Sequence, residues 1–260
     1  MSKYKYGHVK DKPDHRDFLR APRPRTSPLP ASVDLRHVVK LPILDQGQLG
    51  SCTANAIASA HLFNQLKQPG GHDELGSRLA LYYGERALEG TISEDAGAQI
   101  RDGIKVLASE GIPPERLWPY NVDNFTLAPP AEVIAEATKH KAIRYSRIPG
   151  KTVDQVSTQG IKEALTDGEV VVIGIDVYES FEAETTISTG SIPVPDTSKE
   201  QLLGGHAIIL VGYDDVKGTF ILQNSWGDQV GDHGFFYLPY AFVDAGLASD
   251  AWVVQLVLED

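Results

Sequence analysis

The apolar residues of this chain repeat with a helical period in the first half and with a strand period in the second. Helices are predicted over 51–67, 77–89, 98–110, 130–140 and 157–167. Strands are predicted over 170–177, 206–213, 219–224, 234–238 and 251–258, with turn residues between them. This order predicts an α+β protein with two lobes, and a cleft between two such lobes is a natural place for a site.

Composition restricts the partners that the chain can have. Its 260 residues carry a net charge of -11, from 24 basic and 35 acidic residues. Nucleic acid is not an expected partner, because backbone phosphates require a basic surface. A membrane is not expected either, since no apolar run approaches the roughly 20 residues that span a bilayer. The oligomeric state is left open by these data.

Cysteine usage and the N-terminus bear on the compartment. Cys52 is the single cysteine, which excludes an intramolecular disulfide framework. Residues 1–25 are charged and contain prolines, so they lack the apolar core of a signal peptide. A cytoplasmic location is the default expectation, and export by a route without a cleaved signal stays open. Residues 1–28 as a whole predict an extended arm and not a packed element.

Cys52 opens the first predicted helix, after the run Asp-Gln-Gly-Gln-Leu-Gly-Ser at 45–51. A thiol at a helix N-terminus feels the partial positive charge of unpaired backbone N–H groups, which favours its thiolate. Gln46 can fold back through the Gly-rich turn and offer its side-chain N–H to an oxygen bound near the sulfur. The alternative is a buried and unreactive cysteine, which is the usual state of a free thiol.

The predicted strands supply two further polar side chains. Gly204 and Gly205 precede His206, so its imidazole can be approached closely. Asn224 ends the next strand, and Trp226 points to the same face two residues later. Cys, His and Asn suffice for acyl chemistry: a thiolate attacks a carbonyl carbon, an imidazolium protonates the leaving amine, and an amide orients the imidazole. Taken singly, each residue favours a structural role over catalysis: His206 that of a core histidine and Asn224 that of a turn residue.

Together these segments resemble the three signatures of papain-like cysteine peptidases. The matching segments are Gln-Gly-Gln-Leu-Gly-Ser-Cys at 46–52, Gly-His-Ala at 205–207 and Asn-Ser-Trp-Gly at 224–227, with Val-Asp-Leu-Arg at 33–36 similar to a mature N-terminus. Segments at 77–79, 94–97 and 100–104 resemble the disulfide-free group of bacteria and archaea. The similarity extends in order over about residues 29–258.

The resemblance implies a papain-like two-lobe fold over 29–258, with the active-site cleft between the lobes. The helical left lobe would span about 37–140 and an antiparallel β-barrel right lobe about 141–250, with the termini crossing between them. The implied catalytic residues are Cys52 as nucleophile, His206 as acid and base, Asn224 as the group that orients it, and Gln46 as oxyanion donor.

The resemblance also implies where substrate binds. The implied substrate-binding residues are Gly97, Ala98, Gly174, Gly204, Gly205 and Trp226. Gly97 and Ala98 would pair with the substrate backbone, while Gly174 and Gly204 would lie near the pocket for the side chain two residues before the scissile bond.

Four positions depart from the family pattern. Thr53 replaces a usual tryptophan, Leu49 a usual cysteine and Val230 a second tryptophan, and Ala98 stands at a usual glycine. The long helical prosegment of the family is also replaced, by about 28 residues. We interpret residues 1–28 as a short inhibitory arm, with a disordered tail as the alternative.

The predicted function is a cysteine peptidase that hydrolyses peptide bonds through a thioester acyl-enzyme, as an endopeptidase acting on protein or peptide substrates. Two alternatives stay open. The same residues could transfer an acyl group to an amine, or the scaffold could bind peptides or other ligands without turnover. No histidine pair has the spacing of a zinc site, so neither a metal nor another cofactor is expected.

Overall fold

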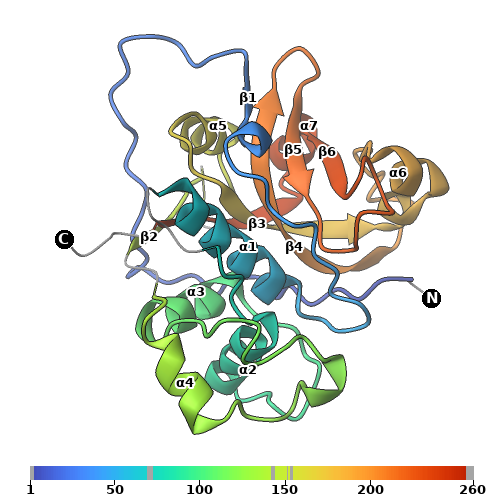
Figure 1. The fold of residues 1–260 in the computed structure, drawn as a ribbon. Coiled ribbons are helices and arrows are strands. Elements are labelled where there is room, and N and C mark those ends of the chain that lie inside the picture. The colour runs from blue at the N-terminus through green and yellow to red at the C-terminus, as the bar shows by residue number, and fades with distance from the viewer. Residues whose placement is uncertain (1–2, 69–72, 142–143, 151, 153–154, 256–260) are drawn as a thin grey trace.

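The computed structural model describes residues 3–68, 73–141, 144–150, 152 and 155–255 (Figure 1). Helix α1 (Cys52–Lys67) lies between a group of helices and a β-sheet (Figure 1). The helical group contains α2 (Arg78–Glu89), α3 (Ile100–Ser109) and α4 (Ala131–Ala137). The sheet carries α5 (Thr158–Thr166), α6 (Glu184–Thr189) and α7 (Tyr240–Asp244) around it. This arrangement confirms the predicted α+β fold with two lobes.

The sheet is antiparallel throughout its paired strands. Its strands are β1 (Ser32–Asp34), β2 (Arg144–Arg147), β3 (Val171–Tyr178), β4 (Leu202–Asp214), β5 (Thr219–Gln223), β6 (Phe235–Pro239) and β7 (Ala248–Gln255). The hydrogen-bonded order is β2-β7-β3-β4-β5-β6, and β1 adds to β4. Within the described residues this path does not close on itself, so the expected barrel is more accurately an open sheet.

Helix α1 occupies the centre of the molecule because it has almost no polar face. Every residue from Cys52 to Phe63 is buried. Small residues such as Ala54 and Ala58 let α1 approach its neighbours on all sides. It contacts β4 and β7 on one side and α2 and α3 on the other. The N-terminus of α1 is thereby fixed at the boundary of the two lobes.

The element boundaries differ from the predicted ones where tertiary pairing extends a strand. Strand β4 begins at Leu202, because β3 provides hydrogen-bonding partners before His206. Strand β2 is absent from the predicted elements, and it is held at the sheet edge by β7. Residues 256–258 of the last predicted strand, and residues 1–2 of the arm, lie outside the described residues. No helix in the described part of the chain is long and apolar enough to cross a membrane.

Candidate active site

The loop before Cys52 is held by side chains from the helical lobe. Asp95 accepts a hydrogen bond from the Gly50 N–H at 2.9 Å and another from the Tyr82 hydroxyl at 2.6 Å. The Tyr120 hydroxyl donates to the Gln46 carbonyl at 2.9 Å. These contacts lie close to Leu49, the position at which the family usually has a cysteine. A polar network therefore anchors this loop in a chain that has a single cysteine.

The Gln46 side chain is fixed at both ends of its amide. Its oxygen accepts a hydrogen bond from the Ser225 hydroxyl at 2.7 Å, which orients the amide. Its nitrogen donates to the Leu49 carbonyl at 3.0 Å and to the Lys5 carbonyl at 3.2 Å. The nitrogen of the predicted oxyanion donor is thus directed at a carbonyl oxygen of the N-terminal arm.

His206 on β4 meets Asn224, which directly follows the neighbouring strand β5. The His206 Nε2 lies 2.8 Å from the Asn224 Oδ1, so the proton is on Nε2. The Nδ1 makes no hydrogen bond within the described residues. The Trp226 ring stacks on the imidazole with centroids 5.0 Å apart and an interplanar angle of 23°. The imidazole is therefore oriented through one nitrogen, and the other nitrogen can act as a base.

The Cys52 sulfur faces the strand that carries His206. The backbone N–H groups of Ala207, the next residue of β4, and of Gly7 in the arm lie near the sulfur, where each acts to lower the pKa of the thiol. The structure thus brings Cys52, His206, Asn224 and Gln46 together at the boundary of the lobes.

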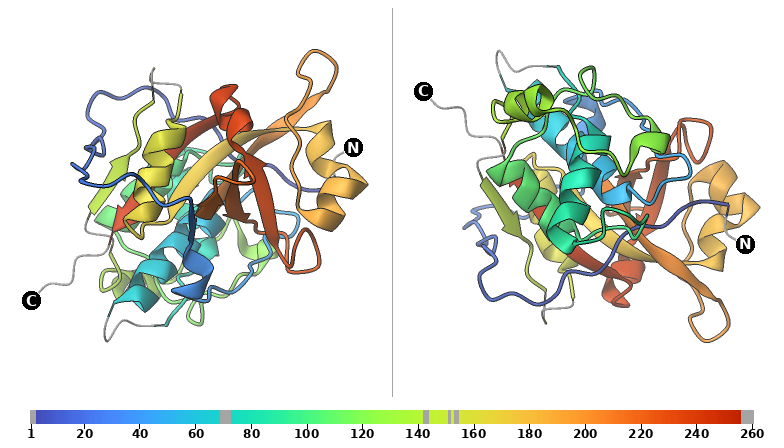
Figure 2. Two further views of the ribbon diagram at one scale, coloured as in Figure 1. Left: turned by 90° about the horizontal axis from the view of Figure 1, so that it is seen from above. Right: turned by 90° about the horizontal axis from the view of Figure 1, so that it is seen from below.

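The N-terminal arm runs along this boundary (Figure 2). The Ala98 N–H donates to the Gly7 carbonyl at 2.7 Å, and the Val9 N–H donates to the Ala98 carbonyl at 3.0 Å. On the other side, the His8 N–H donates to the Gly205 carbonyl at 2.9 Å. The arm therefore binds by its backbone to both lobes, and it runs parallel to the chain at Ala98.

Two aromatic side chains of the arm cover the catalytic candidates. Tyr4 stacks on Trp226 with ring centroids 3.8 Å apart and an interplanar angle of 6°. Tyr6 contacts the His206 ring edge-on, with centroids 5.8 Å apart. Cys52 and His206 are both completely buried as a result of this covering and of their own lobes.

Glycine is required where the arm contacts the two lobes at their boundary, which we call the groove. A Cβ added to Gly7 would lie 1.7 Å from the Gly50 carbonyl oxygen. A Cβ on Gly97 would lie 2.0 Å from the Gly7 oxygen, and one on Gly174 would lie 2.1 Å from the His8 ring. Gly204 approaches Tyr6 in the same way. All six residues predicted to bind substrate therefore contact the arm or its aromatic side chains.

Burial governs the protonation of the two reacting groups in this arrangement. It raises the pKa of the Cys52 thiol to about 11, against the smaller opposing effect of backbone N–H donors. It lowers the pKa of His206 to about 4, although the bond to Asn224 acts in the opposite direction. With the arm in place, the pair is a neutral thiol and a neutral imidazole.

Hydrogen bonds and ion pairs anchor the arm beyond His8, and no sequence pattern predicts them. Asp11 accepts hydrogen bonds from the Arg101 N–H at 3.1 Å and from the Trp252 indole at 2.8 Å. Asp17 binds Arg101 through two bonds of 2.8 and 2.6 Å and lies 3.3 Å from an Arg147 nitrogen. These partners come from α3, β2 and β7, which are far apart in the sequence.

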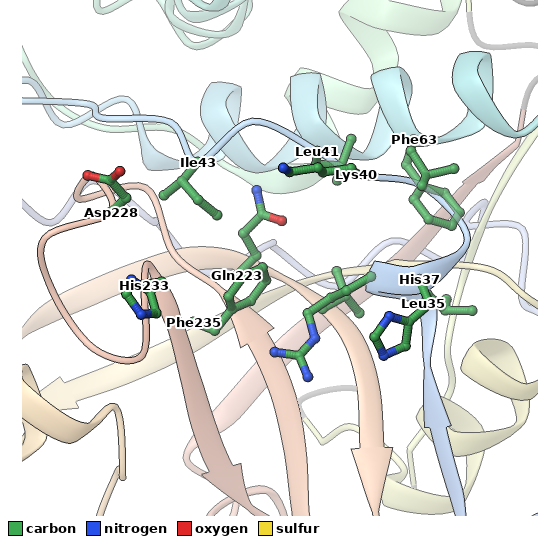
Figure 3. Close-up of a pocket in the computed structure, with 13 residues that line it drawn as sticks. Leu35, His37, Lys40, Leu41, Ile43, Phe63, Gln223, Asp228, His233 and Phe235 are labelled. Carbon is green, nitrogen blue, oxygen red and sulfur yellow. The ribbon is translucent and has the colours of Figure 1, made fainter.

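A separate pocket of about 650 Å³ lies between the segment after β1 and the β5–β6 region (Figure 3). Its lining includes Lys40, Phe63, Gln223 and His233, together with Arg36, which pairs with Asp34. The residues predicted for catalysis and substrate binding are not among the 13 that line it. Within the described chain, no group of three or more His, Cys, Asp or Glu side chains is arranged to hold a metal ion.

A sequence model described as papain family cysteine protease matches residues 29–254. The chain belongs to the papain family. An uncharacterized peptidase C1-like protein of Acanthamoeba polyphaga mimivirus is 42% identical over 274 residues, which cover 98% of this chain and 88% of the relative. Cathepsin K of Gallus gallus is 29% identical over 241 residues, covering 85% and 65% of the two chains.

Solved structures of the papain family match the whole fold. The crystal structure of xylellain, a cysteine protease from Xylella fastidiosa, has a TM-score of 0.87 at 36% identity and covers 99% of each chain. Digestive procathepsin L 3 of Tenebrio molitor has a TM-score of 0.70 at 21% identity, covering 93% of this chain and 75% of the other, and supports the fold alone. The chain is therefore a cysteine-type peptidase, a hydrolase of a family that acts on proteins or peptides.

One departure from the papain-family pattern is accommodated inside the helical lobe. Thr53 is buried, and its hydroxyl donates to the Glu85 carboxylate at 2.7 Å. Glu85 is itself completely buried, which raises its pKa well above the usual range. Glu85 also contributes, after burial, to the raised pKa of the Cys52 thiol.

Proposed function

We propose that this papain-family protease cleaves internal peptide bonds with Cys52 as nucleophile and His206 as acid and base. The orientation of His206 carries the proposal, because Nε2 is bound to Asn224 while Nδ1 has no partner among the described residues. An imidazole in this state can accept the thiol proton at Nδ1. Asn224 then acts as a positioning residue that fixes the tautomer.

The proposed reaction has two steps. The Cys52 thiolate attacks the substrate carbonyl carbon, and the resulting oxyanion is held by the Gln46 side-chain N–H and the Cys52 backbone N–H. His206 protonates the leaving amine, which leaves a thioester on Cys52. Water then attacks the thioester with His206 as base, so that the acid product leaves and the thiol is restored.

The path of the arm supports endopeptidase action. Tyr4 lies on Trp226 at one side of Cys52, and His8 lies against Gly174 and Gly205 at the other. A peptide chain is thus accommodated on both sides of the nucleophile. This is what a protease needs in order to cleave within a chain, because substrate residues must bind before and after the scissile bond.

We further propose that residues 3–28 inhibit the enzyme in this arrangement. A thiolate needs a carbonyl carbon as its target, but the arm presents the Gly7 N–H to the sulfur. The Lys5 carbonyl of the arm accepts a hydrogen bond from the Gln46 side-chain nitrogen, the group proposed to hold the oxyanion. The arm also buries Cys52 and His206, which opposes formation of the charged pair. Inhibition therefore has a steric and an electrostatic component.

A full-length chain with Gly7→Val tests both proposals, because the Cβ clash at Gly50 displaces the arm without removing it. We expect this variant to cleave an internally quenched peptide with blocked ends, and Gly7→Val/Cys52→Ala to be inactive. Cleavage that survives Cys52→Ala would exclude Cys52 as nucleophile. Peptide binding without cleavage in both proteins would favour the non-catalytic module, and a ligated product with an added amine would favour acyl transfer.

A further inference from the structure

The pocket that holds the His8 ring is a closed site with an acidic wall. The His8 side chain is completely buried, and its Nε2 lies 3.1 Å from the Asp250 Oδ2. We propose that, when the arm leaves, this pocket selects a basic, hydrogen-bond-donating substrate side chain: histidine, arginine or lysine. The selected residue is the one whose backbone pairs with Ala98, two residues before the scissile bond. The inference rests on the proposed peptidase function.

The shape of the pocket fits one planar or slender side chain. Gly174 forms one wall, and even a methyl group there would lie 2.1 Å from His8 Cε1. Gly205 forms another wall, since its Cβ position is 3.1 Å from His8 Nδ1. The two glycines belong to the paired strands β3 and β4, with Gly174 opposite Ala207 and Gly205 opposite Asp176. The sheet thereby provides the space for a side chain, and Asp250 provides the polar end.

The hydrogen bonds of Asp250 divide into those that stay and those that leave with the arm. Oδ1 is bound by Arg147 at 3.1 Å, and Ser249 donates its hydroxyl to Oδ2 at 3.1 Å. The other two donors to Oδ2 belong to the arm: the His8 ring and the Asp11 N–H at 2.9 Å. When the arm leaves, Oδ2 loses both of these donors.

A buried carboxylate oxygen that has lost two of its three donors, and keeps only the Ser249 hydroxyl, favours any ligand that restores them. An imidazole, guanidinium or ammonium group does so, whereas a leucine or phenylalanine side chain supplies no donor. Arg147 remains on Oδ1 and holds the carboxylate in place. Asp250 also has a φ of 54°, a left-handed conformation that a β-branched or large apolar residue would adopt poorly. The backbone at this position therefore suits the acidic residue that the pocket uses.

The test uses full-length Gly7→Val with peptide substrates that differ only at the residue two positions before the scissile bond. We expect kcat/KM for histidine, arginine or lysine to exceed that for leucine by about tenfold or more, the ratio that corresponds to one restored donor. In Gly7→Val/Asp250→Asn, which keeps the shape and tolerates the same backbone, the ratio should fall below about threefold. Equal rates for the basic and leucine peptides, or a ratio unchanged by Asp250→Asn, would overturn the proposal.

Two comparisons separate this inference from the function on which it rests. Gly7→Val/Asp176→Asn is the matched control, because Asp176 binds Lys10 of the arm and not His8; it should keep the preference. Labelling of Cys52 by peptidyl acyloxymethyl ketones, followed by mass spectrometry, gives a readout that does not require turnover. If no peptide is cleaved but the reagents with a basic side chain still label Cys52 preferentially, only the hydrolytic function is contradicted. Cleavage with no preference in either assay would contradict only the pocket assignment.

Discussion

Gly7 and Gly50 are packed so closely that a Cβ on Gly7 would lie 1.7 Å from the Gly50 carbonyl oxygen. Gly50 belongs to the loop that precedes the nucleophile, and its N–H is fixed by Asp95. Neither partner can move without disturbing a backbone contact. This contact is what allows the Gly7 N–H to reach the Cys52 sulfur, so the arm depends on glycine at position 7.

The first prediction is that Gly7→Val in the full-length chain raises peptidase activity. The added side chain cannot be accommodated, so the arm leaves the groove, and we expect kcat/KM to rise by at least about tenfold, which equals about 1.4 kcal/mol of docking free energy. Initial rates with a quenched peptide measure this. His15→Val, at an exposed arm position, is the control and should change little. Equal activity in wild type and Gly7→Val would show that the arm does not inhibit.

The second prediction concerns the reactivity of the single thiol. Burial raises the pKa of Cys52 to about 11, so iodoacetamide should react slowly with the wild-type chain near neutral pH. Gly7→Val should react at least about tenfold faster, and adding His206→Ala should slow it again because the imidazolium partner is lost. Intact-mass spectrometry follows the reaction, with the urea-unfolded chain as the reference for a free thiol. A wild-type rate equal to that of Gly7→Val would be incompatible with thiol burial by the arm.

The third prediction addresses the oxyanion donor. In the Gly7→Val background, Gln46→Ala should lower kcat by roughly 10²–10³ with a small effect on KM, because this donor acts mainly in the transition state. Steady-state kinetics separate the two parameters. Gln48→Ala, two residues away and exposed, is the matched control and should retain kcat within about threefold. An effect on KM alone would assign Gln46 to ground-state binding instead.

The fourth prediction concerns pH. Burial, followed by the nearby carboxylate of Asp250, raises the pKa of Asp11 to about 6 from an ordinary value of 3.8. The folded chain therefore holds this proton more tightly than the unfolded chain. The resulting contribution to stability is complete below about pH 4 and is lost as the pH rises through about 6. The Arg101 and Arg147 guanidinium groups and the His8 ring lie around the same pair of carboxyl groups.

Urea unfolding of Cys52→Ala chains measures this effect without self-cleavage. Between about pH 4 and pH 7, the free energy of unfolding of the chain with Asp11 should fall relative to that of the Asp11→Asn variant by up to about 3 kcal/mol. Asp14→Asn is the control, because Asp14 pairs with Arg16 within the exposed arm. Parallel pH profiles with and without the Asp11→Asn substitution would rule out a raised Asp11 pKa.

The helices and the buried strands are predictable because their signals are local. The apolar stripe of α3 and the β-branched run of β3 each determine their own element, whatever lies beside them. The strand β2 is not predictable, since the polar segment Arg144–Arg147 becomes a strand only by pairing with β7. The site candidates Cys52, His206 and Asn224 can be predicted from the sequence, because each lies in a short motif of consecutive residues.

The sequence by itself determined the two-lobe α+β fold, the papain-family membership and the set of chemically competent side chains. It did not determine what lies against them. Only the tertiary structure brought Gly7 close to Cys52. It also brought His8 to Asp250, although these two residues are 242 positions apart in the sequence. These contacts join an arm without helices to strands and loops from both lobes, so no local period or motif encodes them. Their physical basis is the packing of backbone against glycine and the hydrogen bond between the buried His8 and Asp250 side chains, and both depend on the folded arrangement.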